Sequence, residues 1–513
     1  MYPGYWADLQ PDKPAAINTF TGETVTYGQL DSRSNQLARL LYAEGLRQGD
    51  HASLFMENNL RYYEVVWAAL RSGLYITTVN RFLTAEEAAY IVNDSQSKAL
   101  ITSSYLNDAA HGMSSLIPNC SIKLAVDGEV SGFTCYEDAI ANYPSSALEE
   151  QPEGATMLYS SGSTGQPKGI KRRLPQRDIS DFPKRGLAPF SSHWHWDENT
   201  HYLNTAPNYH SGPMLFSVQT QRMGGTVVMM PKYDSLLALK AIEDYRVSHT
   251  QWVPTMLSRL LKLSEAERNQ YDLSSHRVAV HGSAPCSKQL KQAMIDWWGP
   301  ILHEFYGATE GVGSTLVTSE EWLKRPGTVG KAVGATIHVC DEDGKELPIG
   351  ESGMIYFEVT NKVSFSYHND KGKTKRSRHP LHDHWVAVGD IGYVDDEGYL
   401  FLQDRAGYMI ISGGVNIYPR EAEDTLAQHP KVADVVVFGV PNEEMGEEVK
   451  AVVQLEASET EGESTEQELI EYSRENLAHY KCPRSVDFVD HLPRLPTGKI
   501  SIGPIKEQYW KEK

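Results

Sequence analysis

The chain has 513 residues, which is enough for two or more domains, each with its own hydrophobic core. Hydrophobic residues make up 40% of the sequence and charged residues 22%, as in ordinary globular proteins. The 48 basic and 67 acidic residues give a net charge of −19, which argues against general binding to nucleic acids or anionic membranes. An anionic substrate must therefore be attracted by local cations or by a metal ion.

The cysteines and the N-terminus point to a reducing compartment. Five scattered cysteines form no Cys-x-x-Cys pair, so we expect free thiols and neither a disulfide framework nor a zinc site. The N-terminus lacks the basic and apolar regions of a signal peptide. No apolar run approaches the roughly 18 residues of a membrane span. We expect a cytoplasmic monomer or homodimer that binds small molecules, has no membrane span and binds no nucleic acid.

Strand-like apolar runs alternate with amphipathic, helix-like segments, a pattern typical of α/β proteins with helices packed on their sheets. The apolar run 155–158 predicts the end of a buried strand. Further along, the pattern predicts strands at 225–230, 249–253 and 277–281, and helices at 235–245, 254–263 and 286–298. The C-terminal part predicts a small α+β unit with helix 419–427, strand 432–440, an acidic loop and helix start at 456–468, and strand 485–489. We expect an N-terminal domain at 1–404, a hinge at 405–408 and a C-terminal domain at 409–513.

The segment that follows the first apolar run is the most informative one in the chain. Residues 159–169 are Tyr-Ser-Ser-Gly-Ser-Thr-Gly-Gln-Pro-Lys-Gly. Gly162 and Gly165 let the backbone approach a ligand and turn its N–H groups toward an anion. The hydroxyl groups and Lys168 add donors and a mobile positive charge. The segment differs from the Walker loop and predicts a polyphosphate-binding loop, with a flexible Gly/Ser linker as the alternative.

A second motif, Tyr306-Gly307-Ala308-Thr309-Glu310, occurs later in the chain. In a nucleotide site, Tyr306 would stack on a purine and Thr309 would donate to a phosphate. Glu310 would hold Mg²⁺, which prefers hard oxygen ligands. Taken alone, the motif also fits a structural turn.

The two motifs resemble signatures of the adenylate-forming enzymes, the superfamily of acyl-CoA synthetases, adenylation domains and firefly-type luciferases. In the first motif, Ser163 stands where most members have threonine; the second matches the family's Tyr-Gly-x-Thr-Glu motif at every defined position. The resemblance extends from about residue 5 to residue 505. It implies an α/β fold with a large N-terminal domain of several subdomains, in which helices pack on sheets, and a small mobile α+β C-terminal domain.

The resemblance also implies which residues bind ATP. Asp390 and Arg405 match the residues that hold the ribose, although an aspartate or arginine in a turn is more often simply solvated. Residues 282–285 resemble the segment that lines the adenine. The expected ATP and AMP contacts are Ser160, Ser161, Gly162, Ser163, Thr164, Gly165, Lys168, Ser283, Ala284, Pro285, Tyr306, Gly307, Thr309, Asp390 and Arg405.

Lys499, in the run Pro496-Thr497-Gly498-Lys499, matches the catalytic lysine of the family. Carboxylate attack on a phosphate brings two anions together, and one preorganised donor is typically worth roughly 3 kcal/mol. The resemblance implies catalytic roles for Lys499, Thr164 and Glu310, with Glu310 as the Mg²⁺ ligand.

The resemblance places CoA and the hinge in the C-terminal part. Ser412, Gly413 and Gly414 match the loop that borders the CoA tunnel after the small domain rotates. Gly407 stands at the hinge position, where family members usually carry aspartate or lysine. Glycine supplies backbone freedom there, but it puts in doubt an ion-pair latch between the two conformations.

The expected acyl pocket is apolar and aromatic. Residues 202–218 contain no Asp or Glu to pair with a substrate ammonium group, which favours an uncharged acyl group. His210 aligns with a segment that often borders the pocket, with simple packing as the alternative. The expected lining residues are Tyr209, His210, Met214, Phe216, Trp252, Gly282, Val312 and Gly313. The run His193-Trp194-His195-Trp196 has no further metal-ligand pattern around it.

The resemblance implies an AMP-forming acid–thiol ligase, of the fatty-acid or steroid-acid type, that uses ATP, Mg²⁺ and CoA. The carboxylate of a fatty, branched or steroid-side-chain acid attacks the α-phosphate, and the CoA thiol then takes the acyl group from the acyl-adenylate. No general base is needed in the first step, because a carboxylic acid is ionised at neutral pH. The alternatives are an acyl-AMP ligase that delivers to a carrier protein, an aryl or short-chain acyl-CoA ligase, and a non-catalytic nucleotide-binding paralogue. The last alternative predicts decay of a catalytic position, yet Thr164, Lys168, Glu310, Asp390, Arg405 and Lys499 are intact.

Overall fold

The computed structural model describes residues 1–160, 167–181, 192–284, 286–359, 365–405, 410–412, 415–442, 445–494 and 500–510. The chain forms two compact units. The first contains Met1–Leu323 and Asn361–Arg376, and the second contains Lys324–Thr360 and Ser377–Lys513. This division differs from the predicted boundary at 404, and residues 406–408 of the predicted hinge lie outside the described residues. The hinge therefore stays a prediction.

The first unit contains a mostly parallel sheet in which β15 and β2 are antiparallel to their neighbours. Its strands, in spatial order, are β15 (Ser314–Val317), β14 (Leu302–Gly307), β13 (Val278–Gly282), β12 (His249–Trp252), β10 (His201–Asn204), β11 (Thr226–Met229), β1 (Pro14–Asn18) and β2 (Thr24–Thr26). The helices that follow or precede these strands are α1 (Pro3–Leu9), α7 (Ser211–Met223), α8 (Ser235–Asp244), α9 (Pro254–Leu261), α10 (Glu265–Arg268), α11 (Lys288–Trp298) and α12 (Ser319–Lys324).

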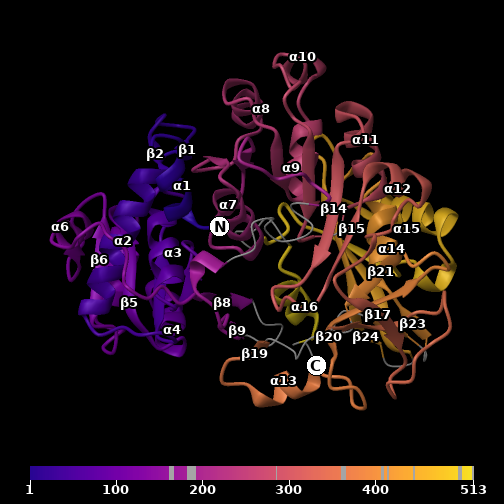
Figure 1. The fold of residues 1–513 in the computed structure, drawn as a ribbon. Helices are drawn as coiled ribbons and strands as arrows, with labels where there is room; N and C mark the ends of the chain where they lie inside the picture. The colour runs from indigo at the N-terminus through magenta and orange to yellow at the C-terminus, as the bar shows by residue number, and fades with distance from the viewer. Residues whose placement is uncertain are drawn as a thin grey trace. The chain divides into compact units, whose positions relative to one another are not determined.

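The two faces of this sheet are covered by different helices (Figure 1). On one face, apolar side chains of α8, α9 and α11 pack on alternate strand residues such as Leu203, Ala279 and Leu302, forming a continuous core. On the other face lies α7, whose Phe216 ring stacks on Tyr202 of β10 at 6.0 Å. Strand residues alternate between the faces, so neighbouring positions in one strand contribute to different environments.

A second sheet of the first unit has eight strands. In spatial order they are β19 (Phe365–Tyr367), β9 (Lys168–Arg172), β8 (Ala155–Ser160), β4 (Tyr75–Val79), β3 (His51–Phe55), β5 (Ser97–Ser103), β6 (Ile122–Val126) and β7 (Thr134–Cys135). The helices of this part are α2 (Tyr27–Ala43), α3 (Arg61–Arg71), α4 (Ala85–Asp94), α5 (Asn107–Ser114), α6 (Tyr136–Ala141) and α13 (Lys371–Arg376). Residues of α4 and α5 share a core with Phe55, Val79 and Leu100 of the sheet.

The second unit contains one antiparallel sheet, one mostly antiparallel sheet and a short strand, β16 (Lys331–Val333). One sheet consists of β17 (Thr336–Cys340), β18 (Gly353–Glu358), β20 (Trp385–Val394) and β21 (Leu400–Arg405). The other consists of β23 (Val415–Ile417), β22 (Ile410–Ser412), β25 (Gly446–Leu455), β24 (Val432–Asn442) and β26 (Ser485–Phe488), which pairs with β25 in parallel. The helices are α14 (Pro419–Leu426), α15 (Glu463–Asn476) and α16 (Ile502–Trp510).

The predicted α/β class and the small C-terminal α+β domain are confirmed. Every strand and helix predicted between 225 and 298 exists, with ends that differ by one or two residues. The local signals explain this agreement: Asp234 caps α8 by accepting from the backbone N–H of Leu237, and Ser287 caps α11 in the same way. The five cysteines, all in the described part of the chain, form no disulfide bonds.

Candidate active site

The ends of the predicted phosphate loop are held together by a β-hairpin. Strand β8 leads into the loop and β9 leaves it, and the Cα atoms of Ser160 and Lys168 are cross-strand partners. The Lys168 Nζ lies 3.8 Å from the Asp370 carboxylate, and both side chains are partly exposed. An entering phosphate can therefore compete for Lys168 without breaking a buried ion pair. Ser161, Gly162, Ser163, Thr164 and Gly165 lie outside the described residues.

The carboxylate of Glu310 is held by a residue that the sequence analysis missed. The hydroxyl group of Tyr367 in β19 donates a 2.6 Å hydrogen bond to Glu310 Oε1, and both residues are buried. A carboxylate accepts several hydrogen bonds or metal ligands at once, so this contact orients Glu310 and leaves acceptor capacity for a cation. Among the described residues, no group of three or more His, Cys, Asp and Glu side chains could hold a metal ion. The role of Glu310 as a Mg²⁺ ligand therefore stays a prediction.

Arg172 joins the phosphate-loop hairpin to the second motif. Its Nη2 donates a 2.7 Å hydrogen bond to the backbone carbonyl of Thr309. A Cβ atom at Gly311, where φ is +67°, would lie only 2.9 Å from the same Nη2. Burial lowers the pKa of the Arg172 guanidinium group, and the nearby Glu310 carboxylate partly offsets this effect. Arg172 therefore brings the two predicted nucleotide motifs together.

The predicted adenine segment follows β13 and meets the first turn of α7. Ser283 has a left-handed backbone conformation with φ of +67°, which is uncommon outside glycine and costs conformational energy. A Cβ atom at Gly212 would lie 3.0 Å from Gln251 Nε2 and 3.8 Å from Ser283 Oγ. Ala284 is half-buried beside Ser283, and Pro285 lies outside the described residues. Tyr306 and Gly307 end the adjacent strand β14.

A buried polar network fixes the segment that carries Tyr209 and His210. The backbone N–H of Asn208 donates to Asn58 Oδ1 at 2.8 Å, and the Tyr62 hydroxyl donates to the Asn208 carbonyl at 2.8 Å. Thr78 donates to the Tyr209 carbonyl at 2.8 Å. His210 precedes α7 directly and its ring contacts the Tyr209 ring at 4.1 Å. The sequence contains no motif that predicts this network, because the burial of its asparagines becomes visible only in the structure.

Two expected acyl-pocket residues make close packing contacts within the fold. Trp252 is fully buried on the sheet face that packs on α8, α9 and α11, and its indole contacts Trp298 at 5.5 Å. Gly282 was expected to leave room for a ligand, but a Cβ atom there would lie 2.4 Å from the Phe305 carbonyl oxygen. Its small size therefore serves close strand packing. Trp252 lies on the face of the sheet opposite α7.

The remaining candidates in the first unit are compatible with a lining role. Met214 and Val312 are buried, and His210 and Gly313 are half-buried. The Tyr209 hydroxyl is buried without a hydrogen-bond partner among the described residues. Such a group is costly unless a ligand or water satisfies it.

The predicted ribose-binding residues occupy paired backbone positions on neighbouring strands of the second unit. Asp390 of β20 and Arg405 of β21 are cross-strand partners, and Asp390 is buried. Ser412 of the predicted CoA loop is buried at the end of β22, whereas Gly413 and Gly414 lie outside the described residues. Lys499 and Gly407 also lie outside the described residues. Arg494 and Ile500, which flank the segment that contains Lys499, form an isolated antiparallel β-bridge with each other.

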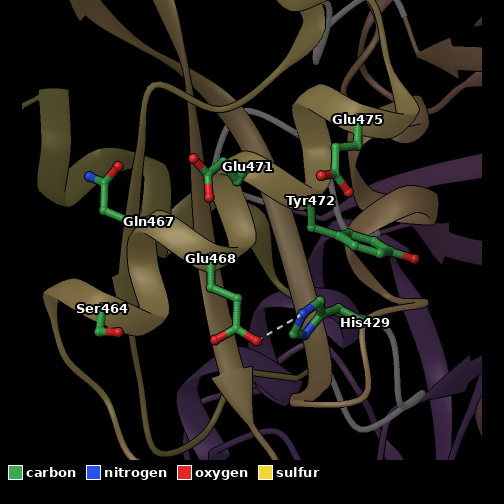
Figure 2. Close-up of a pocket in the computed structure, with 7 residues that line it drawn as sticks. All are labelled: His429, Ser464, Gln467, Glu468, Glu471, Tyr472 and Glu475. Atoms are coloured by element: carbon green, nitrogen blue, oxygen red, sulfur yellow. Dashed lines mark ion pairs between the residues drawn. The ribbon is translucent and has the colours of Figure 1, made fainter.

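A separate hollow of about 440 Å³ lies on the C-terminal part of the second unit (Figure 2). It is lined by α15 and by His429, which lies 3.5 Å from the Glu468 carboxylate. The wall is rich in carboxylates and contains none of the predicted site residues. It is therefore unsuited to binding an anionic nucleotide.

Comparison with known proteins identifies the family. The model of the AMP-binding enzyme family matches residues 5–364, and that of the AMP-binding enzyme C-terminal domain matches residues 421–499. The chain therefore belongs to the AMP-binding enzyme family, which is the adenylate-forming superfamily.

Similar proteins act on different acids. A fatty acid–[acyl-carrier-protein] ligase, ScoC, of Streptomyces coeruleorubidus is 29% identical, covering 99% of this chain and 95% of its own. A 2-succinylbenzoate–CoA ligase of Bacillus licheniformis is 30% identical, covering 96% of each chain. The crystal structure of ATP-bound MatB from Rhodopseudomonas palustris has a TM-score of 0.82 and 26% identity, covering 100% of this chain and 99% of its own.

These findings establish the class of the protein. The chain is an adenylate-forming, AMP-forming acid–thiol ligase that binds ATP and a carboxylic acid. No helix in the described ranges is long and apolar enough to cross a membrane.

Proposed function

We propose that the protein is an acyl-CoA synthetase that activates a carboxylic acid with an apolar acyl group. The observation that carries this proposal is the connection between the two nucleotide motifs. Arg172, at the end of the hairpin with Lys168, holds the Thr309 carbonyl, and Tyr367 holds the Glu310 carboxylate. The hairpin that flanks the predicted phosphate loop and a candidate metal ligand are thereby connected, which supports phosphoryl chemistry at this place.

In the first step, a carboxylate oxygen attacks the α-phosphorus of ATP and the bond to the β-phosphate breaks, which releases pyrophosphate. Glu310 would hold Mg²⁺, which neutralises phosphate charge when bound. Lys168 offsets the negative charge of the β- and γ-phosphates, and Asp390 accepts hydrogen bonds from the ribose hydroxyls. Lys499 offsets the repulsion between the carboxylate and the α-phosphate. The product is an acyl-adenylate.

In the second step, the CoA thiol attacks the acyl carbon, the bond to the phosphate oxygen breaks and AMP leaves, while the thiol proton passes to solvent. Ser412, Gly413 and Gly414 border the path of the thiol arm after the small domain turns about Gly407. This step distinguishes a synthetase from an enzyme that stops at the adenylate.

The alternative acceptor is a carrier-protein thiol, which the similarity to the carrier-protein ligase ScoC favours. The two acceptors are separated by measuring AMP release from the preformed acyl-adenylate with free CoA and with phosphopantetheinylated carrier protein. We expect release within seconds with free CoA. Release that depends on the carrier protein alone would replace the synthetase assignment with an acyl-AMP ligase and leave the first step unchanged.

A further inference from the structure

Three aromatic rings form a continuous cluster beside the predicted acyl pocket. Trp194 stacks on Phe216 of α7 at 5.6 Å, and it contacts Phe305 of β14 edge to face at 6.4 Å. Trp194 and Phe216 are fully buried, whereas Phe305 is half-buried. We call these three residues the aromatic wall. The cluster extends further through Trp196, whose indole lies 5.8 Å from the Phe216 ring.

The strand register places the wall on the face where the pocket is expected. Gly282 of β13 and Phe305 of β14 are Cα partners in parallel strands, so their side-chain positions lie on the same face of the sheet. Helix α7, which carries Met214 and Phe216, covers this face. Trp252 belongs to the opposite face. An acyl group between α7 and the ends of β13 and β14 would therefore meet the half-buried ring of Phe305.

The wall begins next to the second predicted nucleotide motif. Phe305 precedes Tyr306, the first residue of the second motif, and one strand residue spans only about 3.3 Å. The Phe305 ring also lies over Gly307, where an added Cβ atom would approach Phe305 Cζ to 3.0 Å. Behind Phe305, the buried Trp194 ring fills the space in the direction of α7. A substrate group cannot enter the space that these close-packed aromatic rings occupy unless neighbouring side chains move.

We propose that the aromatic wall restricts the substrate to a compact acid, either an aryl acid of about one ring or a short-chain acid. This inference rests on the proposed function and narrows its substrate, and it disfavours the long-chain and steroid acids expected from the sequence. An aryl group would gain offset or edge-to-face contact with the Phe305 ring. A long alkyl chain would have to displace Trp194 from its contacts with Phe216.

The test is the rate of pyrophosphate release with benzoate, butanoate and decanoate, measured as kcat/KM for the wild type. One methylene in an apolar pocket commonly changes kcat/KM by roughly 10- to 200-fold. We therefore expect benzoate or butanoate to exceed decanoate by at least about 100-fold. A kcat/KM for decanoate equal to that for the compact acids would refute the restriction by the aromatic wall but would leave the proposed function intact. No pyrophosphate release with any of the three acids would contradict both.

Variants locate the effect at Phe305. Phe305→Ala should reduce the preference for the compact acids over decanoate by about tenfold or more, and Phe305→Leu, which preserves more packing, should reduce it less. Phe133→Ala removes another half-buried ring, one that packs beside Val130 on the core of the second sheet of this unit, and should leave the preference unchanged. An unchanged preference in folded Phe305→Leu and Phe305→Ala enzymes would contradict the proposal. If Phe305→Ala does not fold, the Phe305→Leu result decides.

Discussion

Replacing Tyr367 by phenylalanine tests whether this residue positions Glu310, the proposed Mg²⁺ ligand. The substitution removes only the hydroxyl group that donates 2.6 Å to Glu310 Oε1, and the ring remains in its buried place. A hydrogen bond to a buried charged group contributes about 1.5–3 kcal/mol. If this energy orients Glu310 toward Mg²⁺, its loss weakens metal-dependent nucleotide binding by about 10- to 100-fold.

The assay is pyrophosphate release as a function of Mg²⁺ concentration at fixed ATP, combined with calorimetric binding of ATP in the presence and absence of Mg²⁺. In Tyr367→Phe we expect a higher half-saturating Mg²⁺ concentration and weaker binding of Mg-ATP, with metal-free ATP bound as in the wild type. Tyr233→Phe is the matched control, because its hydroxyl bonds the Met256 carbonyl at 3.0 Å beside the core formed with α8 and α9. An unchanged Mg²⁺ dependence in Tyr367→Phe, or an equal change in Tyr233→Phe, would refute the positioning role.

Three further predictions concern other parts of the molecule. Lys499→Ala should lower the rate of pyrophosphate release by roughly 100-fold or more, while calorimetry should show that ATP binding is retained. Pyrophosphate release at the wild-type rate would contradict the proposed mechanism. Asp390→Asn should raise the KM for ATP about tenfold and reduce the preference for ATP over 2′-deoxy-ATP; a preserved preference would remove Asp390 from the ribose site. Burial lowers the pKa of His276 to about 3 in the folded protein. As the pH falls below about 6.5, the unfolded chain binds a proton at this residue and the folded protein does not, so the free energy of unfolding decreases. Urea unfolding should show that His276→Asn reduces the loss of stability between pH 7.5 and 5 by about 2 kcal/mol; an equal loss in both proteins would contradict this.

The sequence predicted the elements of the fold well because local signals mark them. Short apolar runs that end at glycine or proline, and capped amphipathic segments such as α8 and α11, are set mainly by neighbouring residues. The same signals do not say which face of a strand meets which helix. For this reason Trp252 was assigned to the pocket although it belongs to the core beneath α9 and α11.

The contacts within the candidate site were beyond the reach of sequence reasoning. Tyr367 and Glu310 are 57 positions apart, and Arg172 and Thr309 are 137 positions apart. Neither Tyr367 nor Arg172 lies in a recognisable motif. The pairing of β9 with β19 places the two residues on neighbouring strands, and each then contacts the second motif through a hydrogen bond. By contrast, the family motif alone predicts Asp390 and Arg405 as ribose-binding residues. Their Cα atoms are cross-strand partners, and the ribose-binding role stays a prediction.

We propose that the protein joins a carboxylic acid to AMP before any thiol takes part. ATP–pyrophosphate exchange without CoA measures this reaction alone, because labelled pyrophosphate enters ATP only by reversal of adenylate formation. We predict exchange that requires a carboxylic acid, with benzoate or butanoate among the active acids. The absence of exchange with every acid tested, or cleavage of ATP to ADP and phosphate, would contradict adenylate formation by this protein.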